Sequence, residues 1–121
     1  MGFDLALWHR QRPYSRDEAG AIYRALCRGD ASVVDPSPRV SDFVGELTSR
    51  YPGIDDYPLE KLDDCPWNCA FDISPGHVIL SIAWSRLEEV LPLVGELAAR
   101  NKLTIYNPQD SELTCPGETA T

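Results

Sequence analysis

The feature that most constrains the fold is a hairpin pattern in the middle of the chain, which reads CAFDISPGHVILSIAW over residues 69–84. Two apolar runs flank a Ser-Pro-Gly turn, and the second run, residues 78–83, has the β-branched content of a strand buried within a sheet. A turn centred on Pro75 and Gly76 sets the register and places both members of each cross-strand pair on one face. The predicted pairs are Ser74 with His77, Ile73 with Val78, Asp72 with Ile79 and Phe71 with Leu80.

Periodic apolar residues predict a strand and two helices before the hairpin. Residues 3–8 alternate with the period of a strand that has one face in the core. Ser15 and Glu18 have the spacing of a capping box and open a helix that runs to about residue 29. A second helix is predicted over residues 38–51, because a serine followed by proline opens it and a Pro-Gly pair ends it.

A third helix and a final strand follow the hairpin. Ser85 and Glu88 repeat the capping-box spacing and open the helix. Pro92 lies beyond its first turn, so we expect a kink or a later start. Residues 103–106 alternate as a strand, and the polar residues 110–121 are expected to form a frayed tail.

This order of elements predicts an α+β fold, a ferredoxin-like βα(α)ββαβ sandwich formed by one domain over residues 1–109. We expect a four-stranded sheet with the first and third strands parallel and central, and with helices on one face. The predicted core face holds Phe3, Leu5, Leu7, Phe71, Ile73, Val78, Leu80, Ile82, Leu103 and Ile105. The predicted open face holds Asp4, Ala6, Trp8, Asp72, Ser74, His77, Ile79, Ser81, Ala83 and Tyr106.

The charge and hydropathy of the chain limit the classes of partner and the compartment that we expect. The chain of 121 residues has 19 acidic and 11 basic side chains, a formal net charge of −8, which disfavours nucleic acid and favours a basic partner. No apolar run is long enough to span a membrane. The first eight residues lack the basic and apolar regions of a secretory signal, so we expect a cytoplasmic protein.

The four cysteines do not predict a metal site, and no cofactor is expected. Cys65 and Cys69 are separated by three residues, and neither histidine is near them in the sequence, unlike the ligands of a zinc site. We expect free thiols in a reducing cytoplasm, with a bridge between Cys65 and Cys69 as the alternative. The glycines form no phosphate-binding motif.

Acidic side chains gather in residues 54–68, a stretch without clean periodicity that precedes the hairpin. These acids lack the regular alternation and turn glycine of a calcium loop. Trp67 lies beside them, and interfaces concentrate binding energy in tryptophan, tyrosine and arginine. A solvated acidic loop and a core tryptophan are the simpler alternatives. The predicted partner-binding residues are Asp55, Asp56, Asp63, Asp64 and Trp67.

The open face offers a second candidate site. If the central strands are parallel, Asp4 and His77 begin them and Tyr106 ends a neighbour, so an acid, an imidazole and a phenol could converge for proton transfer. Trp8 would be an exposed anchor there, whereas Trp84 is expected in the core. Apolar residues on this face would also allow a homodimer. The residues of this alternative site are Asp4, Trp8, His77 and Tyr106. The simpler explanations are surface positions for Asp4 and His77 and closure of a core edge for Trp8.

Three runs, the opening MGFDLALW, the internal SIAWSR and the closing IYNPQ, resemble a widespread group of small bacterial proteins, some of which are regarded as immunity proteins of polymorphic toxin systems. The resemblance implies an association with a toxin and brings no functional residues with it. An acidic, compact domain also suits the blocking of a basic toxin such as a nuclease. We therefore expect a non-enzymatic immunity-type protein that occludes a toxin. The alternative is a small-molecule-binding or catalytic domain that uses the open sheet face.

Overall fold

The computed structural model describes residues 2–9 and 14–114, and within them the chain has an α+β fold. The elements are β1 (Gly2–His9), α1 (Arg16–Cys27), η1 (Ala31–Val33), α2 (Pro38–Arg50), η2 (Ile54–Asp56), η3 (Leu59–Asp64), β2 (Asp72–Ser74), β3 (His77–Ala83), η4 (Trp84–Arg86), α3 (Leu87–Arg100), β4 (Leu103–Asn107) and β5 (Glu112–Thr114), where η marks a short 3-10 helix. No helix in this described part of the chain is both long and apolar enough to cross a membrane.

The strands form one sheet in the order β2-β3-β1-β4-β5, and every neighbouring pair is antiparallel. The predicted α+β class is confirmed, and the first and third strands are central as predicted. The prediction that these two strands are parallel is wrong. A helical crossover makes β2 parallel to β1, and the hairpin then reverses the chain, so β3 must run against β1.

The sheet has five strands rather than the four that were predicted. The additional strand, β5, lies in the segment expected to be a frayed tail, where Glu112 pairs with Asn107 and Leu113 with Tyr106. Ser111 turns the chain with a φ of 60°. Residues 115–121 of the expected tail lie outside the described residues.

The central hairpin has the predicted register over its three inner pairs, Ser74 with His77, Ile73 with Val78 and Asp72 with Ile79. β2 ends there, so Phe71 does not join the ladder. Gly76 is needed in the turn because a Cβ at this position would lie 2.6 Å from the carbonyl oxygen of Asp35. The segment before α2 thus lies directly against the turn, and Ser37 also donates its N–H to the Pro75 carbonyl at 3.0 Å.

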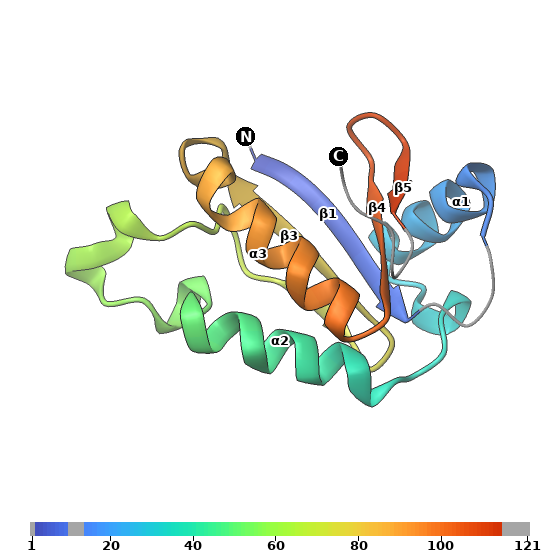
Figure 1. Ribbon diagram of the computed structural model, residues 1–121, viewed down its shortest axis with the longest axis horizontal. Helices are drawn as coiled ribbons and strands as arrows, with labels where there is room; N and C mark the ends of the chain where they lie inside the picture. The colour runs from blue at the N-terminus through green and yellow to red at the C-terminus, as the bar shows by residue number, and fades with distance from the viewer. Residues whose placement is uncertain (1, 10–13, 115–121) are drawn as a thin grey trace.

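Helices cover both faces of the sheet (Figure 1), so the prediction of helices on one face is wrong. α2 and α3 pack on one face with a large apolar cluster that includes Phe43, Leu80 and Val94. α1 packs on the opposite face, beside β4 and β5. Gly20 permits this close approach, because a Cβ there would lie 3.2 Å from the Tyr106 hydroxyl.

The first two helix starts are confirmed and the third is not. Ser15 forms the predicted capping box, accepting from the Glu18 N–H at 3.1 Å while its own N–H donates to the Glu18 carboxylate at 3.2 Å. Ser37 caps α2 through the Arg39 N–H at 3.2 Å. α3 begins at Leu87, after η4, without a side-chain cap, and Pro92 lies inside it. The later start was one of the two outcomes that the proline predicted.

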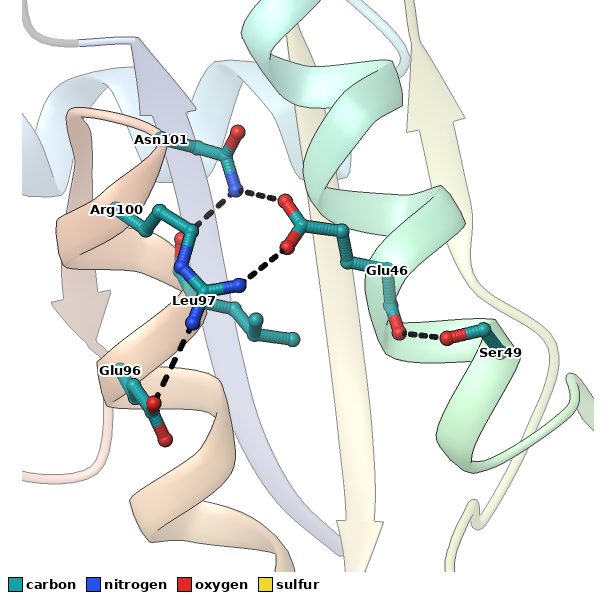
Figure 2. A network of polar contacts seen from close by, with 6 residues as sticks. All are labelled: Glu46, Ser49, Glu96, Leu97, Arg100 and Asn101. Atoms are coloured by element: carbon teal, nitrogen blue, oxygen red, sulfur yellow. Dashed lines mark hydrogen bonds and ion pairs between the residues drawn. The ribbon is translucent and has the colours of Figure 1, made fainter.

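A polar network joins α2 to the C-terminal end of α3 (Figure 2). Glu46 accepts from the Arg100 guanidinium at 2.8 Å and from the Asn101 amide at 2.9 Å. The same Asn101 amide donates to the Leu97 carbonyl at 2.9 Å. The hydrogen bond from Asn101, aided by Arg100, lowers the pKa of Glu46 from its ordinary value. These contacts fix α2 beside α3 on one face of the sheet.

Candidate functional site

Residues 54–64 form a segment, here named the acidic arm, that projects from the body of the molecule (Figure 1). It contains η2 and η3, and its acidic side chains Asp55, Asp56, Glu60, Asp63 and Asp64 are all exposed. Leu59 is 85 % exposed and Leu62 is 41 % exposed. Residues three apart in a 3-10 helix lie on the same side, so these leucines form an apolar ridge among the acids.

The base of the acidic arm is closed by Trp67. This side chain is 3 % exposed, and its indole N–H donates to the carbonyls of Tyr51 at 3.2 Å and Pro52 at 3.0 Å. These bonds join the chain before the arm to the chain after it. The main chain around Trp67 is also attached to β3, since Ala83 donates to Pro66 at 2.7 Å. The prediction that Trp67 is an exposed partner contact is therefore wrong, because the residue is a buried anchor.

Arg86 of η4 supplies a second attachment for the arm. Its guanidinium donates to the Asp64 carbonyl and pairs with the Glu89 carboxylate at 2.7 Å. The Tyr51 hydroxyl donates to the same carboxylate at 2.6 Å. The bonds from Arg86 and then Tyr51 lower the pKa of Glu89 from its ordinary value. Polar contacts thus hold the arm's base while the acids and leucines of η3 face solvent.

No group of three or more histidine, cysteine or acidic residues in the described part of the chain could hold a metal ion. The acids of the arm therefore do not converge on a common point there. Cys65 is buried and Cys69 exposed, and both thiols are free, so the alternative bridge does not form. Cys27 is also free, and Cys115 lies outside the described residues.

The residues of the alternative site, which was predicted on the open face of the sheet, do not lie close together. Asp4 pairs with Ser81, whereas His77 pairs with Trp8, four residues further along β1. At about 3.4 Å per residue, Asp4 and His77 are separated by about 14 Å along the sheet. The antiparallel direction of β3 causes this separation, since it places His77 at the end of the sheet away from Asp4.

The face on which the alternative site was predicted is covered by the chain itself. Trp8 is 1 % exposed, His77 3 % and Tyr106 5 %. The Tyr106 ring contacts Tyr23 of α1 at 5.6 Å between centroids, and Trp8 contacts Tyr14 at 6.1 Å. Side chains that were expected to form an open site or a dimer surface instead belong to a second core.

The three tryptophans divide between core and surface. Trp8 and Trp67, the candidates for exposed anchors, are buried, which agrees with the alternative that each closes a core edge, while Trp84, expected in the core, is 54 % exposed. Trp84 follows the last residue of β3 and enters η4, so strand parity no longer directs its side chain. Its ring packs at its edge against Phe3, with centroids 5.3 Å apart.

Buried polar side chains form a transverse row beneath this covered face. Trp8 pairs with His77 on one side and with Thr104 on the other. The Trp8 indole nitrogen, His77 Nε2 and Thr104 Oγ1 are buried without a hydrogen-bond partner. Ser74 Oγ lies 2.5 Å from His77 Nδ1, and Asp72 lies 3.7 Å from Nε2, too far for a hydrogen bond.

The Asp72 carboxylate, the His77 imidazole and the Ser74 hydroxyl therefore lie in a row at the hairpin. The Ser74 hydroxyl also accepts the Gly76 N–H at 3.2 Å, so both of its hydrogen bonds are made within the hairpin. Burial lowers the pKa of His77, and the nearby Asp72 raises it by less. A buried neutral imidazole held by a turn serine is suited to fixing the hairpin rather than to attacking a substrate.

An apolar groove runs along the outer edge of the sheet, between α2 and β2. It consists of two hollows of about 480 Å³ and about 350 Å³ that share Val44 and Ile73. No protein-family model, curated protein or solved structure matches this chain. Among the exposed features of the described residues, the acidic arm and this groove are both suited to contacts with another macromolecule.

Sequence reasoning found the acids of the arm and missed its leucines. Leu59 and Leu62 lie in a stretch without regular periodicity, and only their spacing of three residues hints at a common side. Ile73 was assigned to the core face by alternation, yet it is 53 % exposed. Its face is correct, but β2 is an edge strand and α2 leaves that edge open.

Proposed function

We propose that this chain is a cytoplasmic, immunity-type binding protein that occludes a basic toxin domain with its acidic arm. The observation that carries the proposal is the exposure of Leu59 and Leu62 among acids on an anchored, projecting segment. Charge at the rim of an interface steers association, while burial of apolar groups at its centre supplies affinity. The arm carries both.

The acids and the leucines have different roles in this proposal. Asp55, Asp56, Asp63 and Asp64 attract the basic partner, an effect that salt weakens because the side chains are exposed. Full burial of a leucine side chain contributes about 1.5–3 kcal/mol. Leu59, at 85 % exposed, has most of that contribution still available for binding.

Trp67 has a positioning role in the proposal rather than a contact role. A segment held at its base loses less conformational entropy on binding than a free loop. The two hydrogen bonds of the indole N–H and the bond from Arg86 to the Asp64 carbonyl supply that restraint.

The proposal extends to the fold, for which we propose a ferredoxin-like sheet lengthened by β5. The first four strands keep the order of the split βαβ arrangement, which supports this assignment.

The test is co-expression with each toxin domain encoded beside this gene, scored by growth and by the binding of the purified pair. Leu59→Ser with Leu62→Ser should abolish rescue, because the apolar centre of the contact is removed. Asp63→Asn with Asp64→Asn should slow association about tenfold at low salt, with the difference disappearing at high salt.

Asp17→Asn with Asp42→Asn is the matched control, since it removes two exposed charges outside the arm. This control should keep both rescue and the association rate within about twofold of the unchanged protein. The proposal is overturned if no neighbouring toxin is neutralised, or if the control weakens binding as much as the arm variants do.

A further inference from the structure

The groove between α2 and β2 is apolar along most of its length. One hollow is lined by Pro36, Ser37, Pro38, Val40, Ser41, Val44, Ile73, Ser74 and Pro75. The other is lined by Val44, Thr48, Gly53, Ile54, Asp55, Asp56, Ala70, Phe71 and Ile73. Val44 and Ile73 line both hollows, so the hollows lie side by side, and the first residues of the acidic arm line the second.

The floor of the groove ends at an unpaired strand edge. β2 pairs with β3 alone, and a two-residue turn makes Ser74 and His77 a hydrogen-bonded pair. The next pair, Ile73 with Val78, is then a pair without mutual hydrogen bonds, so the N–H and C=O of Ile73 point away from the sheet. Among the described residues, neither group of Ile73 has a hydrogen-bond partner.

The side chain of Ile73 marks where an added strand would pack. It shares a face with Val78, which is 0 % exposed, yet Ile73 itself is 53 % exposed because β2 is the last strand on this side. A strand placed against β2 would cover Ile73, and its alternate side chains would point toward Val44 in the groove.

The charge around the groove selects the chemistry of the occupant. The lining of both hollows contains no lysine or arginine, and Asp55 and Asp56 close one end. Asp72, on the strand edge itself, has a side chain that is 58 % exposed. A second copy of this chain would bring an equally acidic edge and a net charge of −8 against the first, which disfavours self-pairing.

We infer that an extended segment of the protein partner, with alternating apolar and basic residues, adds to the free edge of β2 and fills the α2–β2 groove. The inference rests on the proposed function only in taking the partner to be a protein. Main-chain bonds to Ile73 give the segment its direction, apolar side chains enter the hollows beside Val44, and basic side chains meet Asp55, Asp56 and Asp72.

The probe is a capped heptapeptide of alternating lysine and valine, titrated into the isotope-labelled protein and followed by backbone amide chemical shifts. The Ile73 amide should shift strongly and gain protection from hydrogen exchange. Ile73→Pro removes the outward N–H at a position where an edge strand tolerates proline, and should weaken binding about tenfold. Ile73→Val retains the N–H and is the matched control, expected within about twofold.

A second variant leaves β2 unchanged in case proline perturbs the hairpin. Asp55→Asn with Asp56→Asn removes the charges at the end of the groove and should weaken the basic peptide severalfold. A glutamate-valine peptide of the same length should not bind, and neither should a lysine-valine peptide that is N-methylated at every residue, because its methyl groups block both edges of the strand and leave no N–H for the ladder.

Three results would overturn the inference. The first is the absence of binding by the lysine-valine peptide, and the second is a set of shifts confined to the arm. The third is a concentration-dependent shift of Ile73 without peptide, which would identify a second copy as the occupant. Each leaves the toxin-rescue result intact, so failure of the groove is distinguishable from failure of the immunity role.

Discussion

The two faces of the sheet share the same strands but differ in how they are closed. The face under α2 and α3 carries a continuous apolar cluster with Phe43, Leu80 and Val94. The face under α1 carries Trp8 and Tyr106 together with buried polar groups that lack partners. The comparison shows that polarity along a strand identifies which residues share a face, and that it does not identify which face is covered.

The apolar face should give the largest loss of stability on truncation. Phe43 of α2 is 0 % exposed within the cluster, so Phe43→Ala should lower the free energy of unfolding by about 3–5 kcal/mol through lost burial and a cavity. Urea unfolding followed by circular dichroism measures this change. Such a loss is a large part of the 5–15 kcal/mol that is typical of a domain.

Trp84→Ala tests whether the loss of stability depends on the burial of an aromatic side chain or on its size. The ring is larger than that of phenylalanine, but it is 54 % exposed at the end of the sheet. We expect a loss of about 1 kcal/mol or less, because most of the side chain already contacts water. An effect equal to that of Phe43→Ala would show that Trp84 closes the core and would remove the distinction.

Sequence reasoning predicted the elements well where one residue pattern decides the local geometry. The turn around Gly76 and the caps at Ser15 and Ser37 lie where they were predicted. The faces of the strands also followed, since Val78 and Leu80 lie in the apolar cluster. Strand direction failed because it depends on the whole connection, and β5 was missed because its three residues, with Leu113 between two polar neighbours, are too few for a periodic pattern.

The candidate site was predictable in its charges and not in its geometry. The exposure of the acids from Asp55 to Asp64 could be predicted from the sequence, because closely spaced carboxylates are not buried together in an apolar core. The burial of Trp67 depends on contacts with the distant Tyr51 and Pro52, which spacing alone does not reveal. The position of α1 likewise determined the burial of Trp8 and Tyr106, and no local pattern states which face a helix will cover.

The polar face should be the source of an acid-dependent loss of stability. Burial lowers the pKa of His77 below its ordinary value, so the fold favours the neutral imidazole. In the unfolded chain the group has a pKa of about 6.5 and takes up a proton first as the pH falls. The contribution of His77 to the free energy of unfolding is therefore fully present above about pH 6.5. It declines as the pH falls below that value, until the pKa of His77 in the folded protein is passed.

Urea unfolding at several pH values, compared with His77→Gln, isolates this effect. The variant should show a flatter dependence below pH 6.5, because it has no imidazole to protonate. Carboxylates distant from His77 contribute equally to both proteins and cancel in the difference, which leaves His77 and its neighbour Asp72 as the groups compared. An unchanged slope would mean that His77 is protonated as easily in the fold as in the unfolded chain, and the polar face would lose its distinguishing property.

The smallest expected change also addresses the difference between the faces most directly. Thr104 of β4 is 0 % exposed, and its hydroxyl oxygen has no hydrogen-bond partner. Thr104→Val replaces that hydroxyl with a methyl group of similar size, so it removes the cost of burying an unpaired polar atom. We expect stability to be unchanged or increased by about 1 kcal/mol, measured by urea unfolding.

Val78→Thr is the reciprocal control on the apolar face, where the same exchange in reverse should cost about 1–3 kcal/mol. A clear loss in Thr104→Val would show that the hydroxyl is satisfied, and Thr104 would then no longer distinguish the polar face from the apolar one.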